Sequence, residues 1–474
     1  MSKKNTPLFR IILGVMVGVA LTQSAMGLTL DEFIGQVKEK NMGLQVALKT
    51  IDALSHKINE REAPTIPQFL VSYSFLSDKK ISTFSSFLGT ESTLQTAGAV
   101  VKTQLASGLS LSGGYELDSS TYPQSSLGGM TKAYSTATTY VEIMYPLWKN
   151  GSGQTTRATR SGIEESYLAA IKLNEFAIDT VLAHAEALYW RASLAREGVT
   201  LAEEAVTRAK KMVAWTQSRE QLALGDPSDL LQVQALQELR QLELRSAKEE
   251  VMAAERAFNA LRGNDPNSAV APLKNMGDPQ LIQLKWPIKG PRKDVHAAYH
   301  TLMAARAKTI VDLDTLEPAL NLIGQLKLNQ TDSTALGVIN RTLATNYPTA
   351  YVGVQFSGAL DMSASTLDTI KLGNKELLQA AELNYKQKTT DADNEWNDLT
   401  HRFDDTQHRL KVVQRFEAIQ RQKWQLESDR HQKGRSTMLQ VLNTEQDYAN
   451  ARLTHLRTKA EILTLFTHRK LFGS

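Results

Sequence analysis

The sequence predicts an α-helical protein that also carries membrane-type β-strands, arranged as two tandem repeats of strands followed by a long helix. Residues 41–67 and 292–318 are both helical stretches, and each reaches a proline 26 residues after its start. Alternating apolar residues follow both stretches, and the alternation is extensive in residues 68–147. Residues 155–224 then form a long helical run without proline. A chain that repeats such a unit is expected to build a wall or a tube instead of a catalytic domain.

Residues 1–27 resemble a secretory signal peptide. They combine a basic start, an apolar stretch at residues 11–21 and a small-residue cleavage site before Leu28. A membrane anchor is the alternative interpretation, but the stretch has about half of the roughly 20 residues that a spanning helix needs. No other segment is apolar enough for such a helix, so strands would have to make any membrane crossing.

Composition and motifs argue against an enzyme. The chain has 474 residues, a net charge of +4 and no cysteine, which excludes disulfides, thiolate metal sites and a cysteine nucleophile. Basic and acidic residues alternate along the helices, so no nucleic acid partner is expected. The sequence has no phosphate loop, dinucleotide fingerprint or nucleophile elbow, and His296 with His300 lacks a third ligand at helical spacing. We expect no cofactor and no metal.

The first repeat covers residues 28–263. An amphipathic helix is expected at residues 30–62, and strands are expected within residues 68–147, where Ser, Thr, Gly and Tyr alternate with apolar residues. Such strands suit a barrel with one lipid face and one water face, although a soluble β-sandwich gives a similar pattern. A long helix at 155–224, a tip turn and a helix at 228–262 complete the repeat.

The long helix carries two apolar heptad stripes. One stripe contains Leu168, Leu182 and Tyr189, and the other contains Tyr167 and Leu188. Two offset stripes indicate a neighbouring helix on each side, as in a cylinder of helices, whereas a globular bundle helix with a wide core face is the simpler alternative.

The second repeat follows a strap at residues 264–291, which holds five of the 13 prolines. The repeat covers residues 292–474. It has a helix, strands at 319–328 and 350–357, a long helix at 365–433, a tip turn and a last helix at 437–472.

Several of these stretches resemble the TolC-like outer-membrane efflux proteins, in the family's order and over nearly all of the mature chain. They are residues 28–33, 140–148, 230–235, 261–263 and 430–434. The resemblance implies a homotrimer whose strands close a β-barrel in the outer membrane and whose helices continue as a tunnel through the periplasm. One copy has too few strands to close a water-filled barrel, and an open sheet in lipid would leave unpaired edges.

The resemblance also implies functions for the two tip turns. Relatives dock a periplasmic adaptor protein there, which in turn joins an inner-membrane pump. Arg430 and Gly434 keep the family's spacing, and Gly225 with Asp226 forms the other turn, where Arg219 departs from that spacing.

The same family often has an acidic ring that gates the aperture. The matching positions are Gln440 and Asn443, which are uncharged, so only Asp229 on the neighbouring turn could supply a charge.

Four aromatic residues are expected at the junction between strands and helices, where they would anchor the protein at the lipid headgroups or simply pack the junction. They are Tyr140, Tyr145, Trp148 and Tyr351.

These observations favour a passive exit duct in the outer membrane, projecting into the periplasm, as the outer component of a tripartite efflux or type I secretion assembly. A soluble periplasmic coiled-coil scaffold or adaptor is the alternative. The cargo stays open between drugs, metal ions and proteins.

Overall fold

The computed structural model describes residues 27–79, 91–123, 133–222, 226–273, 288–341, 343–344, 347–359 and 365–473. The expected signal peptide, apart from Gly27, and the tip residue Gly225 lie outside these ranges. The chain divides into two compact units, and both repeats contribute to each. We call them the helical unit (Met1–Gln45, Val181–Pro287 and Leu399–Lys470) and the sheet unit (Val46–Thr180, Ile288–Asp398 and Leu471–Ser474).

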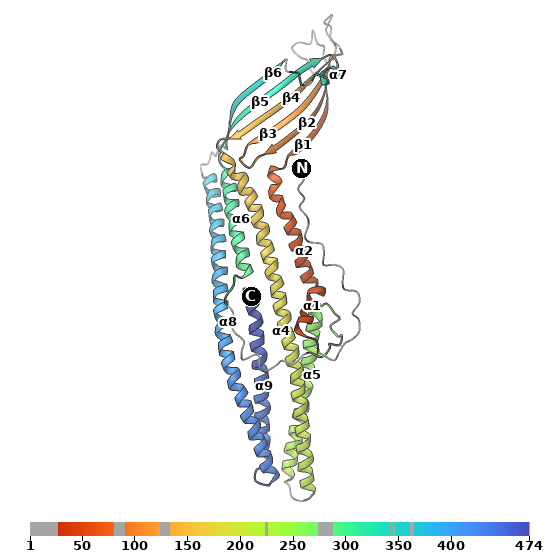
Figure 1. Ribbon diagram of the computed structural model, residues 1–474, viewed down its shortest axis with the longest axis vertical. Helices are drawn as coiled ribbons and strands as arrows, with labels where there is room; N and C mark the ends of the chain where they lie inside the picture. The colour runs from red at the N-terminus through yellow and green to blue at the C-terminus, as the bar shows by residue number, and fades with distance from the viewer. Residues whose placement is uncertain are drawn as a thin grey trace, which may run out of the picture. The chain divides into compact units, whose positions relative to one another are not determined.

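The helical unit contains α1 (Leu30–Lys40), α5 (Pro227–Leu261), α9 (Met438–His468) and the second parts of α4 (Gln154–Gln221) and α8 (Thr366–Gln432) (Figure 1). Thr29 begins α1 with a capping box, because its hydroxyl accepts from the Glu32 amide and the Glu32 carboxylate accepts from the Thr29 amide. Phe33 then stacks on Phe258 of α5 with ring centroids 3.9 Å apart. This buried contact holds α1 on α5.

The first helix is broken at Asn41, where the sequence predicted one helix over residues 30–62. Asn41 has an extended backbone, its side-chain oxygen accepts from the Leu44 amide at 2.9 Å, and its side-chain nitrogen donates to the Leu261 carbonyl at 2.7 Å. The side chain therefore caps the N-terminus of the following helix. It also donates a hydrogen bond to a carbonyl in the last turn of α5.

The sheet unit contains most of α2 (Met42–Lys57), η1 (Ile58–Thr65), six strands, η2 (Gly151–Gly153), α6 (Lys293–Thr315), α7 (Ala335–Ile339) and the first parts of α4 and α8. Figure 1 shows α4 between α2 and α6. Arg61 of η1 lies 2.6 Å from Glu164 of α4, and Lys293 of α6 lies 2.8 Å from Asp179 of α4. Within this unit α4 therefore has two helical neighbours, as its two stripes indicate.

Within the described residues, six strands form one antiparallel sheet in chain order. They are β1 (Gln68–Asp78), β2 (Ser92–Gln104), β3 (Ser110–Thr121), β4 (Ala133–Pro146), β5 (Ala319–Asp332) and β6 (Pro348–Ser357). The first repeat supplies four strands and the second supplies two. Several strands run further into Ser- and Thr-rich sequence than the apolar alternation indicates, because the backbone ladder continues and polar pairs such as Ser119 with Ser135, 2.8 Å apart, join neighbouring strands.

The junction between β4 and α4 depends on a close approach of two backbones. Gly153 has a φ of +75°, and a Cβ there would lie 2.1 Å from the Ala106 carbonyl in the turn between β2 and β3. Asn150 donates its amide to Asp314 of α6 at 2.8 Å. The turn, the junction and α6 are thus tied together.

Among the described residues, no helix combines the length and apolarity that crossing a membrane requires.

Candidate functional site

The strand register divides the sheet into two chemically different faces. Directly paired residues lie on the same side, so Phe69, Val101, Val141 and Leu326 share one face while their sequence neighbours share the other. The first side, the apolar face, includes Phe69, Val71, Phe75, Val101, Leu111, Val141, Ile143, Leu326, Val352, Val354 and Phe356. The second side, the polar face, includes Lys102, Glu116, Asp118, Thr138, Glu142, Gln325, Lys327, Asn329 and Gln355.

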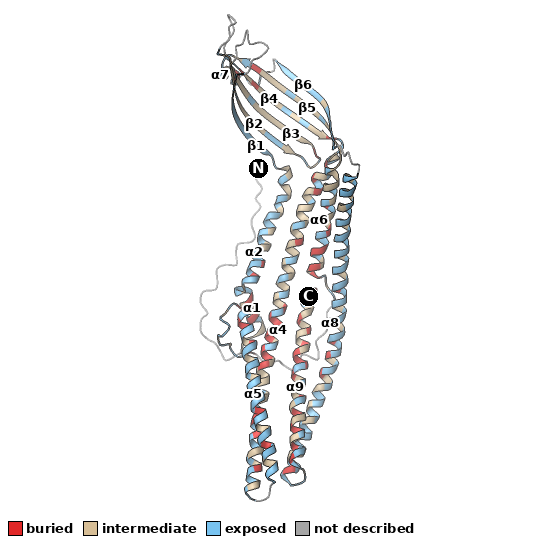
Figure 2. Ribbon diagram, turned by 180° about the vertical axis from the view of Figure 1, so that it is seen from behind, coloured by how far each residue is buried: buried red, intermediate tan, exposed pale blue. Residues whose placement is uncertain are grey.

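The apolar face is exposed even in the middle of the sheet. Val141 of β4 and Leu326 of β5 are each 50% exposed, although both strands have a neighbour on each side. Figure 2 accordingly colours most of the sheet as intermediate or exposed. In a soluble sheet this row would form the buried core, so its exposure marks a surface made to contact an apolar phase or a partner.

The polar face carries charges and hydrogen bonds suited to water. Gln325 donates to Glu142 at 2.8 Å, and Thr96 donates to Asp118 at 2.6 Å. Such a face can line an aqueous lumen, since its polar groups are either paired across strands or free to be hydrated.

Two of the four aromatic residues expected at the junction lie elsewhere, which corrects that prediction. Tyr140 and Tyr351 sit in the middle of their strands on the polar face, and their rings lie over Gly114 and Gly353. An aromatic ring over a strand glycine covers backbone that would otherwise be bare. Sequence spacing could not show this, because the face depends on the register.

The other two aromatic residues do lie at the junction. Tyr145 is the penultimate residue of β4 and belongs to the apolar face, and Trp148 follows the strand with 51% of its surface exposed. Their role as membrane anchors remains a prediction.

The α8–α9 turn is held by a dense set of local hydrogen bonds. Gly434 has a φ of +71°, and the Arg435 amide donates back to the Arg430 carbonyl at 2.8 Å, which ends α8 in a left-handed cap. Thr437 and Gln440 then form a capping box that begins α9. Gln440, expected to face the aperture, is therefore also a structural residue, whereas Asn443 is exposed.

A carboxylate braces this turn from the side of α8. Glu427 accepts from the Ser436 hydroxyl at 2.7 Å and lies 3.0 Å from the guanidinium of Arg430. The Ser436 hydroxyl, followed by Arg430 and Lys423, lowers the pKa of Glu427, against the opposing effect of burial. Arg430 is still exposed, so it can both brace the turn and contact a partner.

The α4–α5 turn begins α5 with a carboxylate cap. Asp226 accepts from the Ser228 amide at 2.8 Å, and this bond lowers the pKa of Asp226. Arg219 stacks on Trp215 with its guanidinium carbon 4.9 Å from the ring centroid. Asp229 lies in the first turn of α5 and is half-buried.

An apolar cluster joins the two turns within the helical unit. Val233 of α5 packs with Met438 and Val441 of α9, and all three are buried. Trp215 of α4 meets His431 of α8 with ring centroids 4.6 Å apart. Beside this cluster lies a groove of about 420 Å³, lined by Arg208, Lys211, Met212, Trp215, Trp424, Ser428, His431, Gln432, Met438 and Val441.

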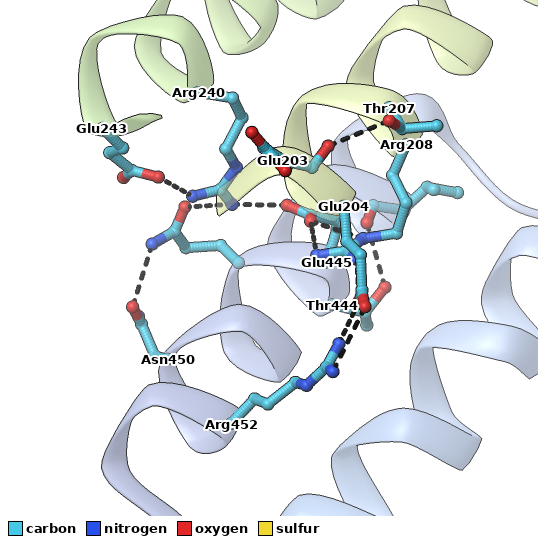
Figure 3. A network of polar contacts seen from close by, with 12 residues as sticks. Glu203, Glu204, Thr207, Arg208, Arg240, Glu243, Thr444, Glu445, Asn450 and Arg452 are labelled. Atoms are coloured by element: carbon cyan, nitrogen blue, oxygen red, sulfur yellow. Dashed lines mark hydrogen bonds and ion pairs between the residues drawn. The ribbon is translucent and has the colours of Figure 1, made fainter. Parts of the chain in front are cut away.

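A buried charge network links α4, α5 and α9 beyond this cluster (Figure 3). Arg240 of α5 donates to Glu445 of α9, and their side chains are only 2% and 1% exposed. Arg208 of α4 reaches the other oxygen of Glu445 at 3.1 Å. Burial disfavours the charged form of Arg240 and so lowers its pKa. The attraction of Glu445 and Glu243 outweighs burial, and the pKa of Arg240 is raised.

No pattern in the sequence indicates this network. In sequence, Arg240 and Glu445 resemble the solvated charges that cover every long helix here, and only the packing of three helices buries them. No group of three or more metal-binding side chains occurs in the part of the chain that the structure describes.

Solved structures with similar folds include an outer membrane protein and two outer-membrane channels. The outer membrane protein VceC from Vibrio cholerae is 14% identical, with 94% of this chain and 96% of that chain covered and a TM-score of 0.65. The CmeC outer membrane channel of Campylobacter jejuni is 17% identical, with 94% and 85% covered and a TM-score of 0.61. The open state of the MtrE outer membrane channel of Neisseria gonorrhoeae is 15% identical, with 94% and 89% covered and a TM-score of 0.65.

No protein-family model and no curated protein matches the chain. At these identities the structural matches establish the fold, and the chain has the fold of these channels. The predicted fold class is thereby confirmed.

Breaking the buried ion pair should destabilise the helical unit strongly. We expect Glu445→Gln to lower its unfolding free energy by about 3 kcal/mol, because two arginines then face an uncharged amide in a buried place. Thermal unfolding followed by circular dichroism measures this. Glu249→Gln removes an exposed partner of Arg245 on the same α5 and should change the free energy by less than about 0.5 kcal/mol. Arg240→Met with Glu445→Leu should recover part of the loss, because Arg208 then loses Glu445 but keeps Glu204 at 3.8 Å. Equal effects of Glu445→Gln and Glu249→Gln would refute the buried pair's role.

Acid should loosen the α8–α9 turn through Glu427. Its pKa in the folded chain is lowered, so its stabilising effect is complete above the ordinary value of 4.5 and is lost as pH falls through the lower folded value. Amide exchange of residues 433–437 should be faster in Glu427→Gln than in the wild type at pH 6. The ratio of the two rates, taken at equal pH, should approach one only as the pH falls well below 4.5. A ratio that stays constant over this range would contradict the prediction.

Proposed function

We propose that the protein is an outer-membrane channel, the exit duct of a tripartite efflux or type I secretion system, without catalytic activity of its own. One observation carries the proposal: an antiparallel sheet with an exposed apolar face and a charged polar face, joined to long helices in the fold of outer-membrane channels. Lipid suits the first face and water the second.

The sheet favours a shared barrel of identical copies. Six strands are too few to surround water, and a sheet in lipid needs partners for both of its edges. A homotrimer in the outer membrane, with its helices in the periplasm, meets both requirements. Passive conduction follows, since an open aqueous tunnel needs no chemistry of its own.

The two helix turns are proposed as the contact for a periplasmic adaptor protein, which would connect the channel to an inner-membrane pump. Arg430 is exposed at the turn, while Gly434 and Asp226 shape the backbone that a partner would meet. The adjacent groove is lined by apolar and basic side chains, so an adaptor segment with apolar and acidic residues would complement it.

A soluble coiled-coil scaffold or adaptor is the competing function. The long helices alone would serve that function equally well. The exposed apolar row in the centre of the sheet does not suit it, because such a surface aggregates in water.

Membrane fractionation distinguishes the two functions. The wild-type chain should occur in the outer-membrane fraction and run as a trimer that dissociates on heating. Val141→Lys places a charge in the lipid-facing row and should reduce membrane assembly at least severalfold. Thr138→Lys on the polar face of the same strand is the matched control and should assemble normally, because its charge lies opposite Glu116. A soluble wild-type monomer would exclude the channel.

The aperture is proposed to lie at Gln440, Asn443 and Asp229. Because two of the three residues are uncharged, trivalent cations should block the wild-type channel weakly. Asn443→Asp with Gln440→Glu should lower the blocking concentration at least tenfold, and glutamate at position 440 preserves the capping box. Single-channel recording measures the block. Micromolar block of the wild type, or no change in the double variant, would remove these residues from the aperture.

A further inference from the structure

The short helix α7 covers a polar part of the apolar face. Toward the end of β4 and β5 that lies away from η2, this face turns polar, and Ser135 there lies opposite Asp332. α7 contacts both strands, and its Val338 is fully buried (Figure 1). A Cβ on Gly337 would lie 2.7 Å from the carboxyl carbon of Asp332, so α7 sits on the same side of the sheet as this residue. Ser135 and Ala137 beneath it are only 5% and 1% exposed.

In return, α7 presents apolar side chains to its surroundings. Leu336 is 74% exposed and Ile339 is 46% exposed, and their spacing of three residues puts them on one side of the helix. Leu343, just after the helix, is 76% exposed. An apolar surface has thus replaced a polar one, which is unfavourable in water and favourable in an apolar phase.

The covered part of the face sets the height of its apolar band. In β5 the apolar side chains run from Leu322 to Leu328, and Gln330 and Asp332 follow on the same face. At about 3.3 Å per residue and a tilt of about 40°, the apolar part alone spans roughly 15 Å of depth. The lipid-facing band of a membrane barrel is about 25 Å tall. Extending the span to Asp332, under α7, gives roughly 25 Å. β1 reaches the same row with its own Phe75.

A basic side chain accompanies this apolar surface. Arg341 follows α7, and its side chain is 70% exposed. The distance of 3.9 Å between its guanidinium and the Asp332 carboxylate is too long for a hydrogen bond. The guanidinium can therefore bind a phosphate through two parallel hydrogen bonds, and lipid phosphates lie where an apolar band ends.

We propose that α7 is a lipid-binding element of the outer leaflet, with Leu336, Ile339 and Leu343 among the acyl chains and Arg341 on a headgroup phosphate. The inference rests on the proposed function, which puts the apolar face in the outer membrane. It adds a specific lipid contact to that function. Continuity with the apolar face and the fit to the band height favour lipid over a protein partner as the occupant of this surface.

Quenching by nitroxide-labelled lipids tests the contact. The native chain contains no cysteine, so Leu336→Cys gives one site for a fluorophore that reports its environment. The purified full chain is reconstituted into phosphatidylcholine vesicles. A nitroxide near the headgroup should quench this label more than a nitroxide near the end of the acyl chain. Val141→Cys, in the middle of the apolar face, should show the reverse order, and Thr138→Cys, on the polar face of the same strand, should be quenched only weakly by both.

The contribution of Arg341 is measured in the labelled Leu336→Cys chain. Nitroxide-labelled phosphatidylglycerol should quench at least twofold more strongly than phosphatidylcholine with the same label, because the anionic headgroup is attracted to the guanidinium. Arg341→Gln should remove this preference, and Arg341→Lys should keep most of it. Inorganic phosphate in the buffer should leave the preference unchanged.

The possible results separate this inference from the proposed function. A Leu336→Cys label that is shielded from water but not quenched by lipid would indicate a protein contact and overturn the inference. A label in water, while Val141→Cys is quenched, would overturn it as well. A preference for phosphatidylglycerol that survives in Arg341→Gln, or that inorganic phosphate abolishes, would overturn the binding of a lipid phosphate by Arg341. If lipid fails to quench Val141→Cys, the proposed function itself is wrong.

Discussion

The structure depends on one constraint, the need to satisfy backbone hydrogen-bonding groups on a sheet whose apolar face is exposed. Inside a soluble domain, the apolar face would be covered and the edges would be blocked. Here Val141 and Leu326 are half exposed in central strands, and in the described part of the chain β1 and β6 are exposed along almost their whole length. An apolar surrounding and a neighbouring strand answer both needs together, and a closed barrel in lipid supplies both.

The two helix turns are held in a different way, by specific polar contacts together with a small apolar cluster. The turn at Gly434 is fixed by its left-handed backbone and by Glu427, and the packing of Val233 with Met438 joins it to the other turn. Arg240 and Glu445 then fix the register of α5 on α9, because a buried ion pair tolerates little displacement. A helix pair held this way is expected to move as a unit instead of bending residue by residue.

The sequence predicted the repeat order and the fold class because both depend on periodicity, and helix and strand periods are local properties. It also predicted the turn glycine Gly434, since ending a helix with a positive φ strongly favours that residue. It failed at Asn41, where one side chain joins two helices through a contact with Leu261, 220 positions away. The misplacement of Tyr140 and the missed pair of Arg240 with Glu445 have the same cause, because cross-strand register and helix packing are long-range properties.

The unequal strand content of the two repeats has an evolutionary consequence. A hairpin adds two strands and reverses direction twice, so the chain enters α4 at the same end of the sheet whether the first repeat holds two strands or four. Gly153, packed on the turn between β2 and β3, ties this turn to the junction between β4 and α4. In the proposed barrel, the diameter of the opening could therefore change by duplication of hairpins while the helices and their turns stay the same.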